Sequence, residues 1–169
     1  MHKTFSFGRT AGTAGALLAL VVSSTVASQQ SASAAAPALQ NQKSGLCLGI
    51  SGGGSAAGTS AIQWQCNNNS DQAWSFVPSS DGFEIQNMNG LCLEAPGWST
   101  TAGTQLDQWT CHGGANQIWY HSGSDTGPIH LINKNSNMCI SDQGGSTSWG
   151  TPIIQWPCND AADQLWDTL

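Results

Sequence analysis

The chain has 169 residues, of which 8% are charged and eight are tryptophan, and its formal net charge at pH 7 is −6. Four Lys and Arg residues cannot form the clustered cations that a polyanion needs, so we expect no nucleic-acid partner and no acidic-lipid partner. Abundant Gly, Ser, Thr, Asn and Gln favour a surface that recognises its ligand through polar side chains and exposed aromatic rings.

The first segment of the chain has the layout of a secretory signal peptide. Lys3 and Arg9 precede an apolar stretch from about Ala14 to Ala27, and a small-residue site, Ala32-Ser33-Ala34, follows. The alternative is a membrane anchor, but a stretch of about 14 residues is shorter than the roughly 20 that a helix needs to span a bilayer. We therefore predict a signal peptide over residues 1–36, cleaved at about 27–36, and a secreted, extracellular protein without a membrane span.

The remaining residues, 37–169, are enough for one domain with one core, which we expect to be a monomer. They contain only Lys43 and Lys134 as basic residues, against all ten Asp and Glu residues of the chain, which gives a formal net charge of −8. An enzyme, a binding module or an interaction protein are all compatible with this size.

A phrase that contains Gly-Thr, Gln-Trp, Cys and Gln-x-Trp occurs three times. The first Cys of each copy lies 11 residues before the Gly, and the second Cys lies 8 residues after that Gly and 8 before the last Trp, in all three copies. This phasing predicts three repeats at about 38–82, 83–127 and 128–169. Because units this short cannot bury a face alone, we expect them to share one core.

Six cysteines are distributed as two per repeat, always 19 residues apart. An even number in an exported chain indicates disulfides, and pairing within each repeat is the simplest arrangement. The predicted bridges are Cys47–Cys66, Cys92–Cys111 and Cys139–Cys158. The alternative, a zinc site, is disfavoured because no Cys-x-x-Cys pair occurs, so we expect no metal and no other cofactor.

Short apolar stretches separated by Gly, Asn and Ser recur within each repeat. In the middle copy they are 83–87, 91–95, 104–109 and 117–120. Stretches of this length are typical of strands, and no stretch of 37–169 has sustained helical periodicity. Four strands per repeat predict an all-β fold of about twelve strands, closed around a threefold axis so that sheet edges are paired.

The phased Cys pairs and the three Gln-x-Trp motifs resemble the ricin B-chain type β-trefoil lectins and the related family 13 carbohydrate-binding modules. The motifs are Gln72/Trp74, Gln117/Trp119 and Gln164/Trp166, and the resemblance covers about residues 38–169. It implies a β-trefoil, in which three hairpins cap a six-stranded barrel with pseudo-threefold symmetry.

The two tryptophans of each phrase have different predicted roles. We expect Trp74, Trp119 and Trp166 to lie in the shared core, where each indole N–H finds an acceptor. The second group is Trp64, Trp109 and Trp156, two residues before the second Cys. If each disulfide joins residues directly opposite on a hairpin, the residue two after the first Cys faces this Trp. The expected facing pairs are Gly49 with Trp64, Glu94 with Trp109 and Ser141 with Trp156.

An acid beside an aromatic ring suits a sugar, because the ring stacks on the apolar face of a pyranose while the carboxylate accepts hydrogen bonds from hydroxyls. The alternative is a Trp that only packs over the disulfide. In the lectin family the acid follows the first Cys by two, an assisting residue follows the second Cys, and an Asn or Asp precedes Gln-x-Trp. Carried over, this implies sites at Glu94, Asp107, Trp109, His112 and Asn116; at Trp156, Asn159, Asp163 and Asp142; and at Trp64, Asn67 and Asp71.

All three copies depart from the family pattern at the acid. Glu94 stands in place of Asp, while Ser141 and Gly49 supply no acid. Asp142 lies one residue later than the family's acid, so alternation predicts that it points to the opposite face unless the strand has ended or bulged there.

Two further sets of residues repeat or stand out. Gln63, Gln108 and Gln155 precede the second group of tryptophans, and we interpret them as structural residues of the inner face that need hydrogen-bond partners. Trp98 and Trp149 lie in Gly- and Ser-rich loops, where ligand contact and surface packing are equally plausible.

The function predicted from these features is a secreted, non-catalytic lectin that binds a galactose-, xylan- or arabinose-type glycan. No His-Glu-x-x-His or phosphate-loop phrase occurs, so we expect no catalytic residues. The alternative is a degenerate β-trefoil that binds a protein partner, for example as a protease inhibitor. Binding that free sugar competes away would separate the two.

Overall fold

The computed structural model describes residues 36–123 and 127–169. The predicted signal peptide falls almost wholly on residues 1–35, outside the described part of the chain. Within the described residues there are twelve strands and four single turns of 3₁₀ helix, and no α-helix. No helix in this part of the chain is long and apolar enough to cross a membrane. The all-β prediction is confirmed.

Each repeat contributes four strands. The first contains β1 (Leu39–Asn41), β2 (Cys47–Ile50), β3 (Thr59–Trp64) and β4 (Trp74–Ser79). The second contains β5 (Gly82–Asn87), β6 (Leu91–Glu94), β7 (Asp107–Thr110) and β8 (Ile118–Gly123). The third contains β9 (Ile129–Asn133), β10 (Cys139–Asp142), β11 (Ile153–Trp156) and β12 (Trp166–Thr168).

Six of the strands form a closed ring. Antiparallel pairs join β4 to β5, β5 to β8, β8 to β9, β9 to β12 and β12 to β1. A single bridge between Ala38 and Ala73, with the Trp74 N–H donating to the Pro37 carbonyl at 2.9 Å, connects β1 to β4. Closing the barrel in this way leaves no long unpaired edge.

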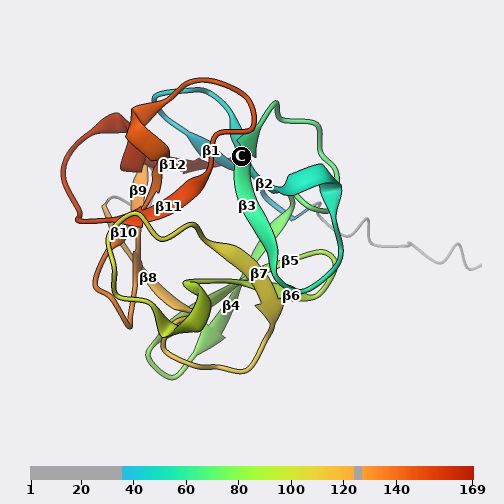
Figure 1. The fold of residues 1–169 in the computed structure, drawn as a ribbon, viewed down its shortest axis with the longest axis vertical. Coiled ribbons are helices and arrows are strands. Elements are labelled where there is room, and N and C mark those ends of the chain that lie inside the picture. The colour runs from blue at the N-terminus through green and yellow to red at the C-terminus, as the bar shows by residue number, and fades with distance from the viewer. Residues whose placement is uncertain (1–35, 124–126) are drawn as a thin grey trace, which may run out of the picture. The chain divides into compact units, whose positions relative to one another are not determined.

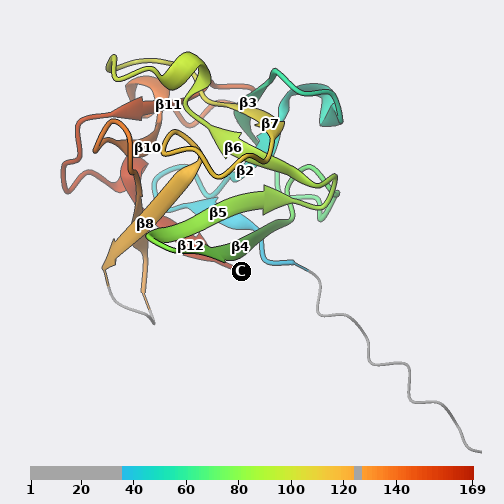
Figure 2. The same ribbon diagram turned by 90° about the horizontal axis from the view of Figure 1, so that it is seen from below.

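The other six strands form the hairpins β2–β3, β6–β7 and β10–β11. Figure 2 shows these hairpins on one side of the barrel strands β4, β5, β8 and β12. In Figure 1 the three repeats follow one another around the centre, from blue through green to red. This arrangement is the predicted β-trefoil, with three hairpins over a six-stranded barrel.

The centre of the barrel holds one aromatic residue from each repeat. Trp74, Trp119 and Trp166 are completely buried in a single apolar cluster. Their indole N–H groups donate to the carbonyl oxygens of Leu48, Leu93 and Ile140, at 3.0, 3.0 and 3.2 Å. Both parts of the prediction for these residues are confirmed: they are core, and each has a partner.

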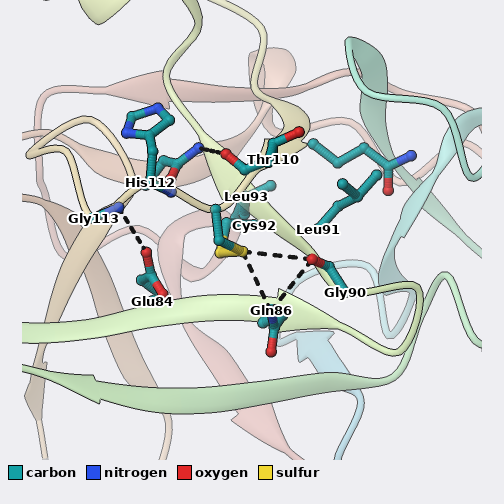
Figure 3. The surroundings of a disulfide bond; sticks show 12 residues. Glu84, Gln86, Gly90, Leu91, Cys92, Leu93, Thr110, His112 and Gly113 are labelled. Atoms are coloured by element: carbon teal, nitrogen blue, oxygen red, sulfur yellow. Dashed lines mark hydrogen bonds between the residues drawn. A yellow bond between two sulfur atoms is a disulfide. The ribbon is translucent and has the colours of Figure 1, made fainter.

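The three predicted disulfides are also confirmed. Cys47–Cys66, Cys92–Cys111 and Cys139–Cys158 are bonded, and the described residues contain no free cysteine. Each bridge closes a loop that carries the hairpin and its tip, so it fixes the hairpin relative to the chain that returns to the barrel. Figure 3 shows the surroundings of the second bridge, where the Gln86 amide donates to the Gly90 carbonyl and lies 3.3 Å from Cys111 Sγ.

Candidate functional site

The three tryptophans that precede the second Cys lie at the ends of the hairpin strands. Trp64, Trp109 and Trp156 are 41%, 44% and 45% exposed, so each ring is partly available to solvent and partly held by its surroundings. Each one is paired with the first Cys of its repeat: Cys47 with Trp64, Cys92 with Trp109 and Cys139 with Trp156.

The predicted facing pairs are therefore wrong by two residues. The partner of Glu94 is Asp107, that of Gly49 is Ile62, and that of Ser141 is Ile154. The reason is that the second Cys of each repeat lies beyond its paired strand and reaches back diagonally to the first. Because side chains alternate, the acid position still lies on the same face as the Trp, two residues further along the hairpin.

Each of these rings also lies on a glycine of another repeat. A Cβ added at Gly58 would be 3.2 Å from Trp109, one at Gly103 would be 3.6 Å from Trp156, and one at Gly150 would be 3.6 Å from Trp64. These are the glycines of the Gly-Thr motif. The glycine of this motif in one repeat therefore supports the tryptophan ring of the next repeat around the axis.

The glutamine before each tryptophan reinforces this contact. Gln63, Gln108 and Gln155 are completely buried, and each side-chain amide donates to two backbone carbonyls of the same neighbouring loop. The acceptors are Ser146 and Ser148 for Gln63, Gly54 and Ala56 for Gln108, and Ser99 and Thr101 for Gln155. The structural interpretation of these residues is confirmed. Their hydrogen bonds join each repeat to its neighbour.

The glutamine of each Gln-x-Trp motif organises the loop after the second Cys. The side-chain oxygens of Gln72, Gln117 and Gln164 accept the backbone N–H of Asn67, His112 and Asn159, at 3.0, 2.8 and 2.8 Å. Sequence reasoning gave these glutamines no site role. Their invariant spacing from the second Cys was the available signal, since it places the amide within reach of that loop.

In the second repeat the expected residues come together around one carboxylate oxygen. Glu94 Oε2 accepts from Gln117 Nε2 at 2.7 Å and from Asn116 Nδ2 at 3.3 Å, and lies 3.6 Å from His112 Nε2. Asp107 lies opposite Glu94 on the same face. Burial, and after it the charge of Glu94, raise the pKa of Asp107 to about 7. This group is rich in acceptors, so it suits a ligand that brings hydrogen-bond donors.

In the first repeat the carboxylate is supplied by a loop residue, Asp71, and not by the strand residue that corresponds to Glu94. Gly49 occupies the place of Glu94, and a Cβ there would be 3.2 Å from Asp71 Oδ2. Asp71 precedes Gln-x-Trp, as Asn116 does in the second repeat, and its Oδ2 accepts the Ile50 N–H at 3.3 Å. The Asp71 carboxylate thus reaches the space that the strand acid would fill.

The third repeat has the same exchange. Ser141 takes the strand position, and its hydroxyl donates to Asp163 Oδ2 at 3.0 Å. Asp163 is the residue before Gln-x-Trp. In every repeat, therefore, the strand position and the loop position lie together, and one of the two carries a carboxylate. Where the strand lacks the acid, in the first and third repeats, the loop supplies it.

Two of these places are hollows in the surface. The first repeat has one of about 420 Å³, whose lining includes Trp64, Asn67, Asp71 and, from the third repeat, Gly150. The third repeat has one of about 430 Å³, whose lining includes Trp156, Asn159, Asp163, Ser141 and, from the second repeat, Gly103. Their equivalent composition shows that the same construction is used twice.

Asp142 is the last residue of β10 and lines the third hollow, although simple alternation predicted that it points away from the site. It is still paired with Ile153 and completely buried, so its carboxyl group lies within the wall of the hollow, and a 3₁₀ turn (Gln143–Gly145) follows it. Burial, and after it the Asp163 carboxylate, raise the pKa of Asp142 to about 8, although Lys43 lowers it. Lys43 also lines this hollow, which no sequence signal indicated.

Two further tryptophans border these places. Trp98 stacks on His112 with 6.1 Å between ring centroids, and Trp149 lies 5.5 Å from Trp64 across the boundary between the third and first repeats. Both are more than half exposed. They extend the aromatic surface of the second and first sites, respectively.

One group of three potential metal ligands occurs in the described residues: Glu84, Cys92 and Cys111. Both sulfurs belong to the second disulfide, and a Glu84 oxygen accepts the Gly113 N–H at 3.0 Å (Figure 3). Disulfide sulfur is not a thiolate and does not serve as a metal ligand. This group therefore anchors the loop after Cys111.

Residues 35–166 match the family described as ricin-type beta-trefoil lectin domain. A comparison with curated protein sequences gave no match.

Solved structures with the same fold include a designed threefold-symmetric protein, ThreeFoil, with 25% identity and a TM-score of 0.76 over 79% of this chain and 96% of that one. An exo-beta-1,3-galactanase from Clostridium thermocellum has 27% identity and a TM-score of 0.76 over 80% of this chain, which spans only 30% of the galactanase. A Macrolepiota procera ricin B-like lectin in complex with lactose has 20% identity and a TM-score of 0.67, over 78% of this chain and 92% of that one.

Proposed function

Because this chain belongs to the ricin-type β-trefoil lectin domain family, we propose that it is a secreted, non-catalytic protein that binds carbohydrate at up to three shallow sites. The observation that carries this proposal is the pairing, in every repeat, of a half-exposed tryptophan with a carboxylate on the same face. A pyranose can stack its C–H face on the ring while its hydroxyls donate to the carboxylate.

The second site is formed by Trp109 and Glu94, with Asp107, His112 and Asn116 around them. Trp109 is the stacking platform. Glu94 Oε1 is the acceptor without a hydrogen-bond partner among the described residues, whereas Oε2 receives the Asn116 and Gln117 amides. Those two bonds orient the carboxylate before a ligand arrives, which lowers the cost of ordering it on binding.

In the first and third sites the carboxylate comes from the loop residue before Gln-x-Trp and not from the strand. Asp71 acts beside Trp64 and Asn67, and Asp163 acts beside Trp156 and Asn159. In the third site the Ser141 hydroxyl takes one oxygen of Asp163, so the other remains available to a sugar hydroxyl. All three repeats therefore keep the minimum chemistry of a sugar site, an aromatic face with an acceptor beside it.

The ligand class that these features favour is a neutral glycan of the galactose, xylan or arabinose type. The Macrolepiota procera lectin, whose structure is a complex with lactose, and the galactanase both support galactose as the first sugar to test. A single site of this kind is weak, with a Kd of about 1 mM, or about −4 kcal/mol. Three sites on one polysaccharide gain avidity if the spacing of the sugars fits.

Secretion is supported by the N-terminal sequence and by three disulfides, which persist in oxidising compartments. Absence of catalysis is supported by the sequence, which contains no His-Glu-x-x-His motif. Its Gly-x-Ser-x-Gly match, Gly49–Gly53, runs from β2 into a single 3₁₀ turn (Ser51–Gly53) and not into the helix that a hydrolase nucleophile elbow requires.

The test is a titration of tryptophan fluorescence in the mature protein with galactose, arabinose, xylose and soluble xylan. Trp64→Ala, Trp109→Ala and Trp156→Ala are titrated in parallel, each after its fold has been checked by circular dichroism. The proposal predicts a saturable change that each substitution reduces in part. No response to any of these ligands, with the fold intact, would overturn it and favour the protein-binding alternative.

A further inference from the structure

The third hollow contains a carboxyl group that has no counterpart in the other repeats. Asp142 corresponds to Ile50 in the first repeat and to Ala95 in the second, both of which are buried and apolar. Asp142 is 0% exposed, and neither of its carboxylate oxygens has a hydrogen-bond partner within the described residues. A fully buried carboxyl without any donor is costly unless something else compensates it.

The surroundings of Asp142 leave room for such a compensating group. Asp142 forms part of the lining of the third hollow, together with Asp163 and Lys43. These two are the charged groups that act on its ionisation: Asp163 disfavours its charged form, and Lys43 favours it. When both acids are ionised, the hollow carries two negative charges and one positive charge. One further cation would balance it.

We propose that the third hollow selects sugars that carry a free ammonium group, that is, hexosamines without an N-acetyl group. The inference rests on the proposed function, because it requires a pyranose stacked on Trp156. An ammonium group brings a positive charge and no acceptor, which suits a hollow whose wall contains a buried carboxyl group without a hydrogen-bond partner among the described residues. The ammonium need not touch Asp142, because charges interact strongly through a poorly solvated wall.

The first hollow is the natural comparison within the same molecule. It has nearly the same volume, a tryptophan and a loop carboxylate, but Ile50 replaces Asp142. Its lining contains one acid, Asp71, and no lysine. It therefore lacks the buried carboxyl group on which the proposed pH dependence of amino-sugar binding rests.

Binding of the ammonium also has a predicted proton balance. Burial keeps Asp142 protonated at neutral pH, because its pKa is raised to about 8. A cation in the hollow stabilises the ionised form, so the carboxyl releases its proton to solvent as the amino sugar binds. The affinity for the amino sugar should then rise between pH 6 and pH 7, and fall again where its own ammonium group loses a proton, at about 7.7–8.0 for a comparable amine.

The experiment isolates the third site in the double variant Trp64→Ala/Trp109→Ala. Galactosamine, galactose and N-acetylgalactosamine are titrated by calorimetry and by Trp fluorescence at pH 6, 7 and 8. We expect galactosamine to bind about tenfold more tightly than galactose at pH 7, where it is still mostly the ammonium form; this difference corresponds to about 1.4 kcal/mol. Asp142→Asn keeps the shape of the side chain and removes its charge. It should reduce the ratio of the affinity for galactosamine to the affinity for galactose to about one.

The remaining outcomes separate this inference from the proposed function. Equal affinities for galactosamine and galactose, or a preference that persists in Asp142→Asn, would overturn the inference alone. No saturable response to any of the three sugars would overturn the lectin function and the inference together. Asp142→Ile, which copies the first repeat, is the second test of charge removal, and thermal unfolding establishes that either variant remains folded.

Discussion

Trp109 of the second repeat lies on Gly58 of the first, so closely that a Cβ at Gly58 would come within 3.2 Å of the indole ring. The same two repeats are joined beside this contact, because the Gly58 N–H donates to the Gln108 carbonyl at 2.7 Å. The binding face of one repeat is therefore completed by the loop of another. A half-exposed tryptophan can be held in one orientation only if its lower face rests on such a support.

Gly58→Ala should disturb both the fold and the second site. Gly58 has a φ of +81°, which costs an L residue about 1–2 kcal/mol, and the new Cβ would also push Trp109. We expect this loss of unfolding free energy together with weaker sugar binding at the second site. Gly103→Ala is the matched control, since its φ is +86° but its Cβ would be 3.6 Å from Trp156, an ordinary contact. Denaturant unfolding should show similar losses, whereas only Gly58→Ala should weaken binding at its tryptophan.

The exchange of the acid between strand and loop can be tested by reversing it in the third repeat. Asp163→Asn should weaken binding at Trp156 by about tenfold or more, because a hydrogen bond to a charged acceptor contributes about 1.5–3 kcal/mol. Ser141→Glu combined with Asp163→Asn recreates the Glu94–Asn116 pair of the second repeat and should restore binding. Titrations in the Trp64→Ala/Trp109→Ala background measure both. A double variant as weak as Asp163→Asn would show that the strand and loop positions are not interchangeable.

Stability should fall as the pH rises from about 4 to 8. The folded-state pKa values of Asp107 and Asp142 are raised from 3.8 to about 7 and about 8. Between the unfolded and folded values the unfolded chain has lost these protons and the folded chain keeps them, so each group destabilises the fold progressively with rising pH. Above the folded value the effect is constant.

Asp142→Asn removes one of these groups and should flatten this dependence. The stability of the variant relative to the natural chain should increase by up to about 1.4 kcal/mol per pH unit between pH 4 and pH 8. Urea unfolding at pH 4, 6 and 8 checks this. A constant difference between the two proteins over that range would contradict a raised pKa at Asp142.

Gln108→Leu should destabilise the fold more than Gln155→Leu. Both side-chain amides donate to two carbonyls of a neighbouring loop, but Gln108 Oε1 also accepts from Asn87 Nδ2 at 2.6 Å. Gln155 Oε1 has no partner among the described residues. Each buried group left unpaired costs about 1–3 kcal/mol, so we expect the two losses to differ by at least about 1 kcal/mol. The denaturant concentrations at the unfolding midpoints of the two variants, compared at the same m value, measure this difference.

The repeat pattern by itself determined the three disulfides, the all-β fold and the division of the tryptophans into core and surface groups. These features follow from spacing within one repeat, since a threefold core needs the same residue at the same phase three times. The resemblance to the lectin family, rather than the repeat pattern alone, predicted that Glu94, Trp109 and Asn116 belong to one site.

Only the tertiary structure decided which residues of one repeat contact another repeat and which residues line each hollow. The contact between Trp109 and Gly58 depends on which repeats are adjacent in space. The position of Lys43 in the third hollow depends on the turn between β1 and β2, far away in the chain. The position of Asp142 in the wall of the third hollow depends on the loop residues that pack beside the end of β10, Asp163 and Lys43 among them. Spacing within a sequence records none of these, because each is set by contacts between separate segments.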